Sequence, residues 1–98
     1  MDVYVKIRKQ GKNVLLSICD ENLLGRTLTE GKIVFKITNE FYYGKKISVE
    51  QAISMIENST IVNLVGNICV EKAIKKGFVH PAAILKIEGI SHAQIVKV

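Results

Sequence analysis

The chain has 98 residues, which is enough for one hydrophobic core and excludes a protein of two domains. Hydrophobic residues make up 48% and charged residues 23%, a composition that excludes a disordered chain. The net charge of +5 favours a polyanionic partner, although abundant lysine and isoleucine also fit the composition of a thermophile. We therefore expect a single domain over residues 1–98.

The N-terminus and the cysteines indicate a cytoplasmic protein with no membrane association. Residues 1–9 enter an alternating strand directly, without the basic and apolar segments of a signal peptide. No apolar run approaches the ~20 residues that a membrane span needs. Cys19 and Cys69 lie far apart, and an intracellular protein normally keeps such cysteines reduced. In a thermophile the two could instead form a bridge.

The first part of the chain has the alternation of an antiparallel hairpin. In residues 3–9, Val3, Val5 and Ile7 face one way and the polar side chains face the other. A glycine-containing turn at 10–13 leads to residues 14–19, whose nearly continuous apolar run is typical of a central strand covered on both faces.

The next segment predicts a short turn, another strand and an aromatic loop. Residues 20–22 can cap a turn that Gly25 ends. In the strand at 32–38, the pattern directs Ile33, Phe35 and Ile37 inward and the lysines outward. Residues 39–47 read as a loop or short strand.

Two helices are expected in the second half. Ser48 and Gln51 form a capping-box pattern, and the buried stripe that follows is Ala52, Ile53, Met55 and Ile56. Residues 61–65 read as a buried strand, followed by a glycine turn and a helix that Gly77 ends. Helical spacing leaves open one long kinked helix over 60–76.

The C-terminal end predicts two strands, 84–89 and 93–98, joined by a hairpin at 89–92. We therefore expect an α+β domain of about six strands and two helices, with a β-hairpin at each end.

Basic and aromatic residues form a first candidate site, for nucleic acid. Lysine and arginine bind phosphates, and exposed aromatic rings stack on unpaired bases. An ordinary solvated sheet face would carry similar residues, and the aromatic loop at Phe41–Gly44 could instead anchor a protein partner. The candidate residues are Tyr4, Lys6, Arg8, Lys32, Lys36, Tyr42, Tyr43, Lys45 and Lys46.

The glycine turn is a second candidate, because a strand that runs into a helix leaves free N–H groups where an anion can bind. Asn63 in the apolar strand needs a hydrogen-bond partner if it is buried, and it either braces a loop or contacts a ligand. The turn itself is Gly66-Asn67.

No metal or catalytic signature is present, and we predict no cofactor. Cys19, Cys69, His80 and His92 lack the spacing of a zinc site. A catalytic pair of Cys19 and His92 requires that folding bring them together, and His92 is expected at an exposed turn.

Four segments resemble one family: CDENLLGRTLTEG (19–31), FYYG (41–44), NLVG (63–66) and GISHAQIV (89–96). The set is similar to a family of small archaeal proteins known as domain of unknown function 424. The resemblance implies an archaeal, cytoplasmic, single-domain protein and a shared surface, with no activity to carry over. The positions that fit the family pattern are Cys19, Asp20, Glu21, Gly25, Asn63, Gly66, His92 and Gln94; Ser91 replaces a proline.

Together these observations predict a non-enzymatic RNA-associated protein of translation, which contacts ribosomal or transfer RNA through its basic sheet face and aromatic loop. Two alternatives stay open. One is a small enzyme or ligand-binding protein with a cleft near Cys19, Asn63 and His92. The other is a protein–protein adaptor that uses the aromatic loop.

Overall fold

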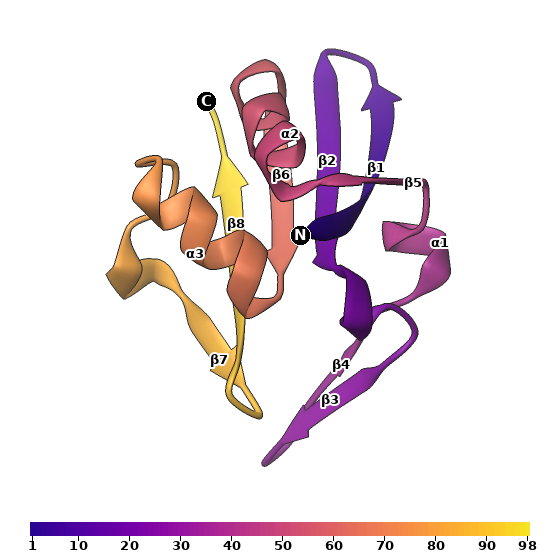
Figure 1. Ribbon diagram of the computed structural model, residues 1–98, viewed down its shortest axis with the longest axis vertical. Helices are drawn as coiled ribbons and strands as arrows, with labels where there is room; N and C mark the ends of the chain where they lie inside the picture. The colour runs from indigo at the N-terminus through magenta and orange to yellow at the C-terminus, as the bar shows by residue number, and fades with distance from the viewer.

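A six-stranded mixed sheet forms the centre of the domain, and Figure 1 shows two helices in front of it. The computed structural model describes residues 1–98. The strand order is β5–β1–β2–β6–β8–β7, and only β2 and β6 pair in parallel. These strands are β1 Asp2–Gln10, β2 Asn13–Asp20, β5 Lys45–Ser48, β6 Ile61–Val65, β7 Leu85–Ile87 and β8 Ile90–Val96. The predicted α+β class is confirmed.

The remaining elements are three helices and a separate hairpin. The helices are α1 Asn39–Tyr42, α2 Val49–Ser54 and α3 Asn67–Lys75, and the hairpin strands are β3 Thr27–Glu30 and β4 Ile33–Lys36. Single turns of 3₁₀ helix occupy Glu21–Leu23, Met55–Asn58 and Pro81–Ala83. None of the helices combines the length and the apolar composition that a membrane-spanning helix requires.

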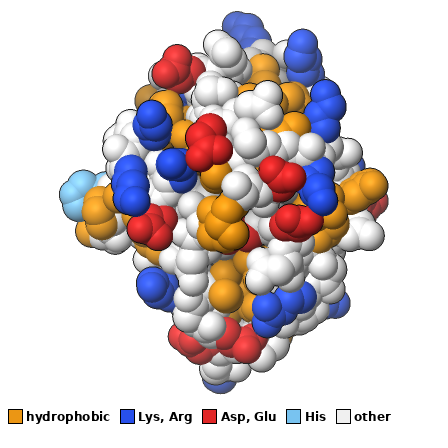
Figure 2. Space-filling view, in the orientation of Figure 1, with side chains coloured by type: hydrophobic (Ala, Val, Ile, Leu, Met, Phe, Trp, Pro, Cys, Tyr) orange, Lys and Arg blue, Asp and Glu red, His pale blue; other side chains and the backbone are white.

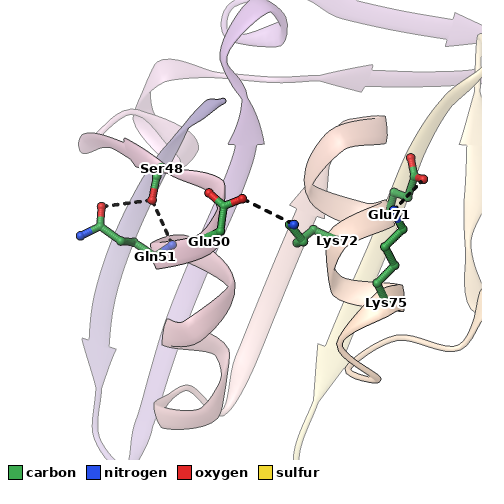
Figure 3. A network of polar contacts seen from close by, with 6 residues as sticks. All are labelled: Ser48, Glu50, Gln51, Glu71, Lys72 and Lys75. Atoms are coloured by element: carbon green, nitrogen blue, oxygen red, sulfur yellow. Dashed lines mark hydrogen bonds and ion pairs between the residues drawn. The ribbon is translucent and has the colours of Figure 1, made fainter.

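The predicted capping box starts α2. The Ser48 hydroxyl accepts a hydrogen bond from the backbone N–H of Gln51 at 3.2 Å (Figure 3). Figure 3 also shows the ion pair that joins the two helices, between Lys72 of α3 and Glu50 of α2 at 3.5 Å. Both side chains are partly exposed, so the net contribution of the pair to stability is small.

The main core lies between α2, α3 and the front face of the sheet. Fifteen buried residues form it, among them Val3, Leu16, Ile53, Leu64 and Cys69. Residues 61–65 are a strand and Asn67–Lys75 a helix, so the prediction of a strand, a glycine turn and a helix is confirmed over the single kinked helix. On the outer surface of the helices, acidic and basic side chains are interspersed (Figure 2).

A second, smaller core lies on the other face, at one end of the sheet. It contains seven buried residues: Cys19, Leu23, Leu28, Ile37, Tyr42, Val65 and Ile87. The β3–β4 hairpin and α1 cover this end, and β3 and β4 pair only with each other.

Because the β3–β4 hairpin stands apart from the sheet, one part of the prediction for the strand at 32–38 was wrong. Ile37 is buried as expected, but Ile33 is 44% exposed near the tip of the hairpin. The segment 39–47, expected to be a loop or short strand, forms the short helix α1 and then the short strand β5 at the sheet edge.

The C-terminal hairpin is shifted relative to the prediction. Its turn is at Glu88–Gly89, where both residues have positive φ, and β8 already begins at Ile90. His92 therefore lies inside a strand rather than at an exposed turn. The shift places its ring on the same face as the second core, opposite Val65 of β6.

Candidate functional site

The register of the sheet aligns polar side chains from four strands on the face opposite α2 and α3. Lys6 of β1 is paired with Ser17 of β2, Ser17 with Asn63 of β6, and Asn63 with Gln94 of β8. Residues directly opposite in neighbouring strands share a face, so these four side chains form one row. We call it the polar row.

A pocket of about 450 Å³ opens above one end of the polar row. Its volume lies in the range of about 300–1,000 Å³ that is usual for small-molecule sites. The sheet supplies its floor and, through His92 of β8, part of its wall, and β4, α1 and the segment between them supply the rest of the wall. The pocket is lined by Phe35, Lys36, Thr38, Phe41, Tyr42, Asn63, His92 and Gln94.

Aromatic rings form much of the pocket wall. The rings of Phe35 and His92 meet edge to face, with centroids 4.9 Å apart. The Phe41 ring lies against the Tyr42 ring, and the Arg8 guanidinium is 5.5 Å from the centroid of the Phe41 ring. Burial lowers the pKa of His92, so its imidazole is neutral at neutral pH and behaves as a flat aromatic wall.

Two amides in the pocket have no hydrogen-bond partner within the protein. Asn63 is half-buried in the floor and Gln94 is exposed beside it. The bracing role considered for Asn63 falls instead to Asn67, whose side chain accepts from the N–H of Ser91 at 2.8 Å and donates to the carbonyl of Gly89 at 3.1 Å. The donors and acceptors of Asn63 and Gln94 thus remain available to a ligand.

The N-terminus of α3, which the sequence marks as an anion site, is occupied by the protein itself. The buried carboxylate of Asp20, at the end of β2, accepts hydrogen bonds from the N–H groups of Ile68 at 2.9 Å and Cys69 at 3.0 Å. Its charge also compensates the positive end of the helix dipole. Asp20 and Gly66 therefore have a structural role at this turn, and no external anion is needed there.

The arrangement of the cysteines and His92 does not form a catalytic pair. Cys19 and His92 share a face, but Val65 of β6 lies between them, and two strand spacings are roughly 10 Å. Both cysteines are fully buried and free. Burial raises the pKa of Cys19 to about 12 and raises that of Cys69 well above its usual value. No group of three His, Cys, Asp or Glu side chains is placed to hold a metal ion.

These pKa shifts predict that both thiols are inert in the folded protein. At pH 8 a thiol of pKa 12 is ionised to only about one part in ten thousand, and only the thiolate attacks a disulfide reagent. We expect no reaction of the native protein with Ellman's reagent within an hour, and release of two equivalents of chromophore per chain in guanidinium chloride. Rapid reaction of one thiol in the native state would contradict the buried placement.

Several residues expected to bind nucleic acid make contacts within the protein. Lys6 and Arg8 both donate hydrogen bonds to the Glu40 carbonyl in α1. Lys46 forms an ion pair with Glu21 at 2.8 Å, and this contact raises the pKa of Lys46.

The expected aromatic residues separate into buried and exposed rings. Tyr42 is only 2% exposed, so it closes the second core and cannot stack on a base. Tyr43 is 55% exposed and packs against Tyr4, with ring centroids 5.6 Å apart. Tyr43 is therefore the most exposed ring of the aromatic loop, while Phe41 is partly exposed and lines the pocket.

The remaining lysines of the predicted interface lie on different surfaces. Lys32 is in the β3–β4 turn and Lys45 is on the edge strand β5, both exposed. Of the lysines predicted to bind nucleic acid, only Lys36 lines the pocket. It lies there with Asn63, His92 and Gln94 from the predicted recognition site. The structure thus joins parts of two sites that the sequence treats separately.

Sequence reasoning missed Phe35, Thr38 and Ser17 as neighbours of this site. Phe35 was expected in the core, and it does pack partly against the second core. The polar row has a signal in the sequence, since Ser17 and Asn63 each interrupt an apolar strand. Their alignment depends on the parallel pairing of β2 with β6, which no local pattern specifies.

A larger groove of about 660 Å³ lies elsewhere, between α2, β5 and the edge of β1. Its lining includes Val5, Ile7, Ile47 and Met55 and contains no aromatic or histidine side chain. The smaller pocket is the better candidate, because it combines aromatic walls with convergent polar groups.

The fold and the pocket define a small α+β domain with a sheet that is covered by helices on one face and carries a polar, aromatic-walled pocket on the other. Residues 7–98 match the family described as "Protein of unknown function (DUF424)", and the chain belongs to that family. The predicted family membership is thus confirmed.

A solved structure has the same fold. It is the crystal structure of an uncharacterized conserved protein from Methanopyrus kandleri, with a TM-score of 0.81 and 25% sequence identity. The similarity covers 100% of this chain and 95% of that one. None of the curated proteins matches the chain.

Proposed function

We propose that this protein is a non-enzymatic RNA-binding protein that holds an unpaired RNA strand across the face of its sheet opposite α2 and α3. The observation that carries the proposal is the pocket at the polar row, where aromatic rings, amides and a cation converge. Unpaired RNA is bound by this combination, because bases stack on aromatic rings while cations contact the phosphates. Ribosomal and transfer RNA are the expected partners, in keeping with a role in translation.

The distribution of charge supports this face over the helical one. The helical face carries interspersed acidic and basic side chains, which give no continuous attraction for a polyanion (Figure 2). On the other face, Arg8 lies over Phe41, and Lys36 lines the pocket without an ion pair. Lys6 and Arg8 are bound to a carbonyl and not to a carboxylate, so their charges are not neutralised.

The chemistry of the site supports binding rather than catalysis. The thiols are held in their protonated form by burial, and the His92 ring lies against Phe35 instead of a nucleophile. A general base must lie within hydrogen-bond reach of the proton that it removes, and the Phe35 ring beside His92 carries no such proton. The groups of the pocket are those of recognition: rings, amides and a lysine.

The proposal is tested by the salt dependence of binding to a fluorescent single-stranded RNA of about ten nucleotides. Each phosphate contact contributes about −0.7 to the slope of log K against log salt concentration for a single strand. We expect Arg8→Ala/Lys36→Ala to weaken binding about tenfold at low salt and, through the loss of two phosphate contacts, to make the slope shallower by about 1.4.

Lys76→Ala/Lys86→Ala is the matched control. It removes the same charge from two exposed lysines outside the pocket, at the end of α3 and on β7. We expect its salt slope to equal that of the unchanged protein. Because Arg8 also contacts α1, thermal unfolding of each variant is measured beside the binding. Equal slopes in both double variants, or no binding by the unchanged protein, would refute the proposal.

A further inference from the structure

We propose that the pocket at the polar row receives one unpaired nucleobase and that Asn63 and Gln94 hydrogen-bond to its edge. This inference rests on the proposed function and specifies how that function is performed. It assigns the pocket a ligand class, a flat heteroaromatic ring with neighbouring hydrogen-bond donors and acceptors. The walls, the floor and the mouth of the pocket each support it.

The walls suit a planar ring. Phe35, Phe41 and His92 line one pocket, and Phe35 and His92 hold each other edge to face at 4.9 Å. Their mutual packing fixes the wall before a ligand arrives, which reduces the entropy lost on binding. Burial keeps His92 neutral, so a base packed beside it meets an aromatic surface rather than a cation.

The floor suits the polar edge of a base. Asn63 and Gln94 are directly opposite each other on antiparallel strands, where side chains lie about 5 Å apart. Each amide offers two donors and an accepting oxygen, and neither side chain hydrogen-bonds within the protein. Every nucleobase carries adjacent donors and acceptors on its edge, and amides are common partners for them.

The mouth of the pocket suits the phosphate that accompanies a base. Lys36 is exposed at the rim, on β4, and Arg8 lies beyond Phe41. A base in the pocket would therefore leave its sugar and phosphate near cationic side chains. A purely apolar ligand would use none of these groups and would leave both amides unpaired, which costs free energy.

NMR titration with the four nucleoside 5′-monophosphates and with ribose 5-phosphate tests the inference. The readout is the side-chain ¹H–¹⁵N resonances of Asn63 and Gln94, and the side chains of Asn22 and Asn58 serve as internal controls. We expect at least one monophosphate to shift the two pocket amides and to leave the controls unchanged. Ribose 5-phosphate carries the same charge without a base, and we expect it to shift neither pocket amide.

The second arm measures binding of a single-stranded oligoribonucleotide to Asn63→Ala/Gln94→Ala. One lost base contact is expected to weaken binding about tenfold while the salt slope stays the same, because no phosphate contact is removed. Asn58→Ala is the control, an exposed amide outside the pocket. Both amides are partly exposed and without partners, so we expect the double variant to fold normally.

The outcomes separate the two proposals. Oligonucleotide binding that the double variant leaves unchanged would refute the base pocket and leave the RNA-binding function standing. Shifts by monophosphates without binding of any oligonucleotide would refute RNA binding and assign the pocket to a free nucleotide. Equal shifts by ribose 5-phosphate and the nucleotides would refute recognition of the base.

Discussion

Replacing Asp20 by alanine is expected to lower the free energy of unfolding by about 3 kcal/mol. The carboxylate is 4% exposed and accepts two hydrogen bonds from N–H groups in the first turn of α3. Its removal leaves the N–H of Cys69 buried without a partner, and an unmade hydrogen bond in the interior costs more than a made one contributes. The loss of an N-terminal cap alone costs about 0.5–2 kcal/mol.

Chemical denaturation of Asp20→Ala, Asp20→Asn and Asp2→Ala measures this effect. Asn retains one accepting oxygen, so we expect it to cost about half as much as alanine. Asp2 is exposed at the start of β1 and accepts no hydrogen bond from a helix, so its replacement should change stability by less than about 0.5 kcal/mol. A cost below about 1 kcal/mol for Asp20→Ala would contradict the capping role.

The Gly66→Ala substitution is expected to be strongly destabilising, at about 4 kcal/mol or more. Gly66 has φ +126°, a conformation that L side chains rarely adopt. A Cβ atom there would lie 2.1 Å from the carboxyl carbon of Asp20, far inside van der Waals contact. The new methyl group therefore adds backbone strain and also displaces the carboxylate from the N-terminus of α3.

A double-mutant cycle separates the two causes. Once Gly66→Ala has displaced the carboxylate, the removal of Asp20 should cost almost nothing more, so the double variant should be about as stable as Gly66→Ala alone. Gly77→Ala is the control, because Gly77 also has positive φ but open space around it, and only the strain of about 1 kcal/mol is expected. Additive costs in the cycle would show that Asp20 stays in place.

These two residues explain why the N-terminus of α3, which has a sequence pattern typical of anion binding, is occupied by a carboxylate of the protein itself. A strand, a glycine turn and a helix leave free N–H groups, and Gly66, which has a φ of +126° and no side chain, allows a carboxylate to approach them closely. The carboxylate that arrives belongs to Asp20, at the end of the neighbouring parallel strand. The pocket that remains open lies on the other face of the sheet, among Asn63, His92 and Gln94.

Elements whose signals are local could be predicted from the residues alone. Alternation marks β1, the Ser48–Gln51 capping box marks the start of α2, and Gly66 separates β6 from α3. Each signal acts within a few residues, where backbone preferences and side-chain spacing are sufficient. The family was also identifiable, because four spaced segments carry its pattern.

Which residues meet depends on long-range packing, which no local pattern specifies. The parallel pairing of β2 with β6 aligns Ser17 with Asn63, and a turn at Glu88–Gly89 moves His92 from the expected loop into a strand. A shift of one residue in a strand reverses the face of every side chain, so local patterns cannot place His92 in the pocket. Tyr42 is buried and Lys36 lines the pocket for the same reason: the packing of α1 and the β3–β4 hairpin on the sheet sets their exposure.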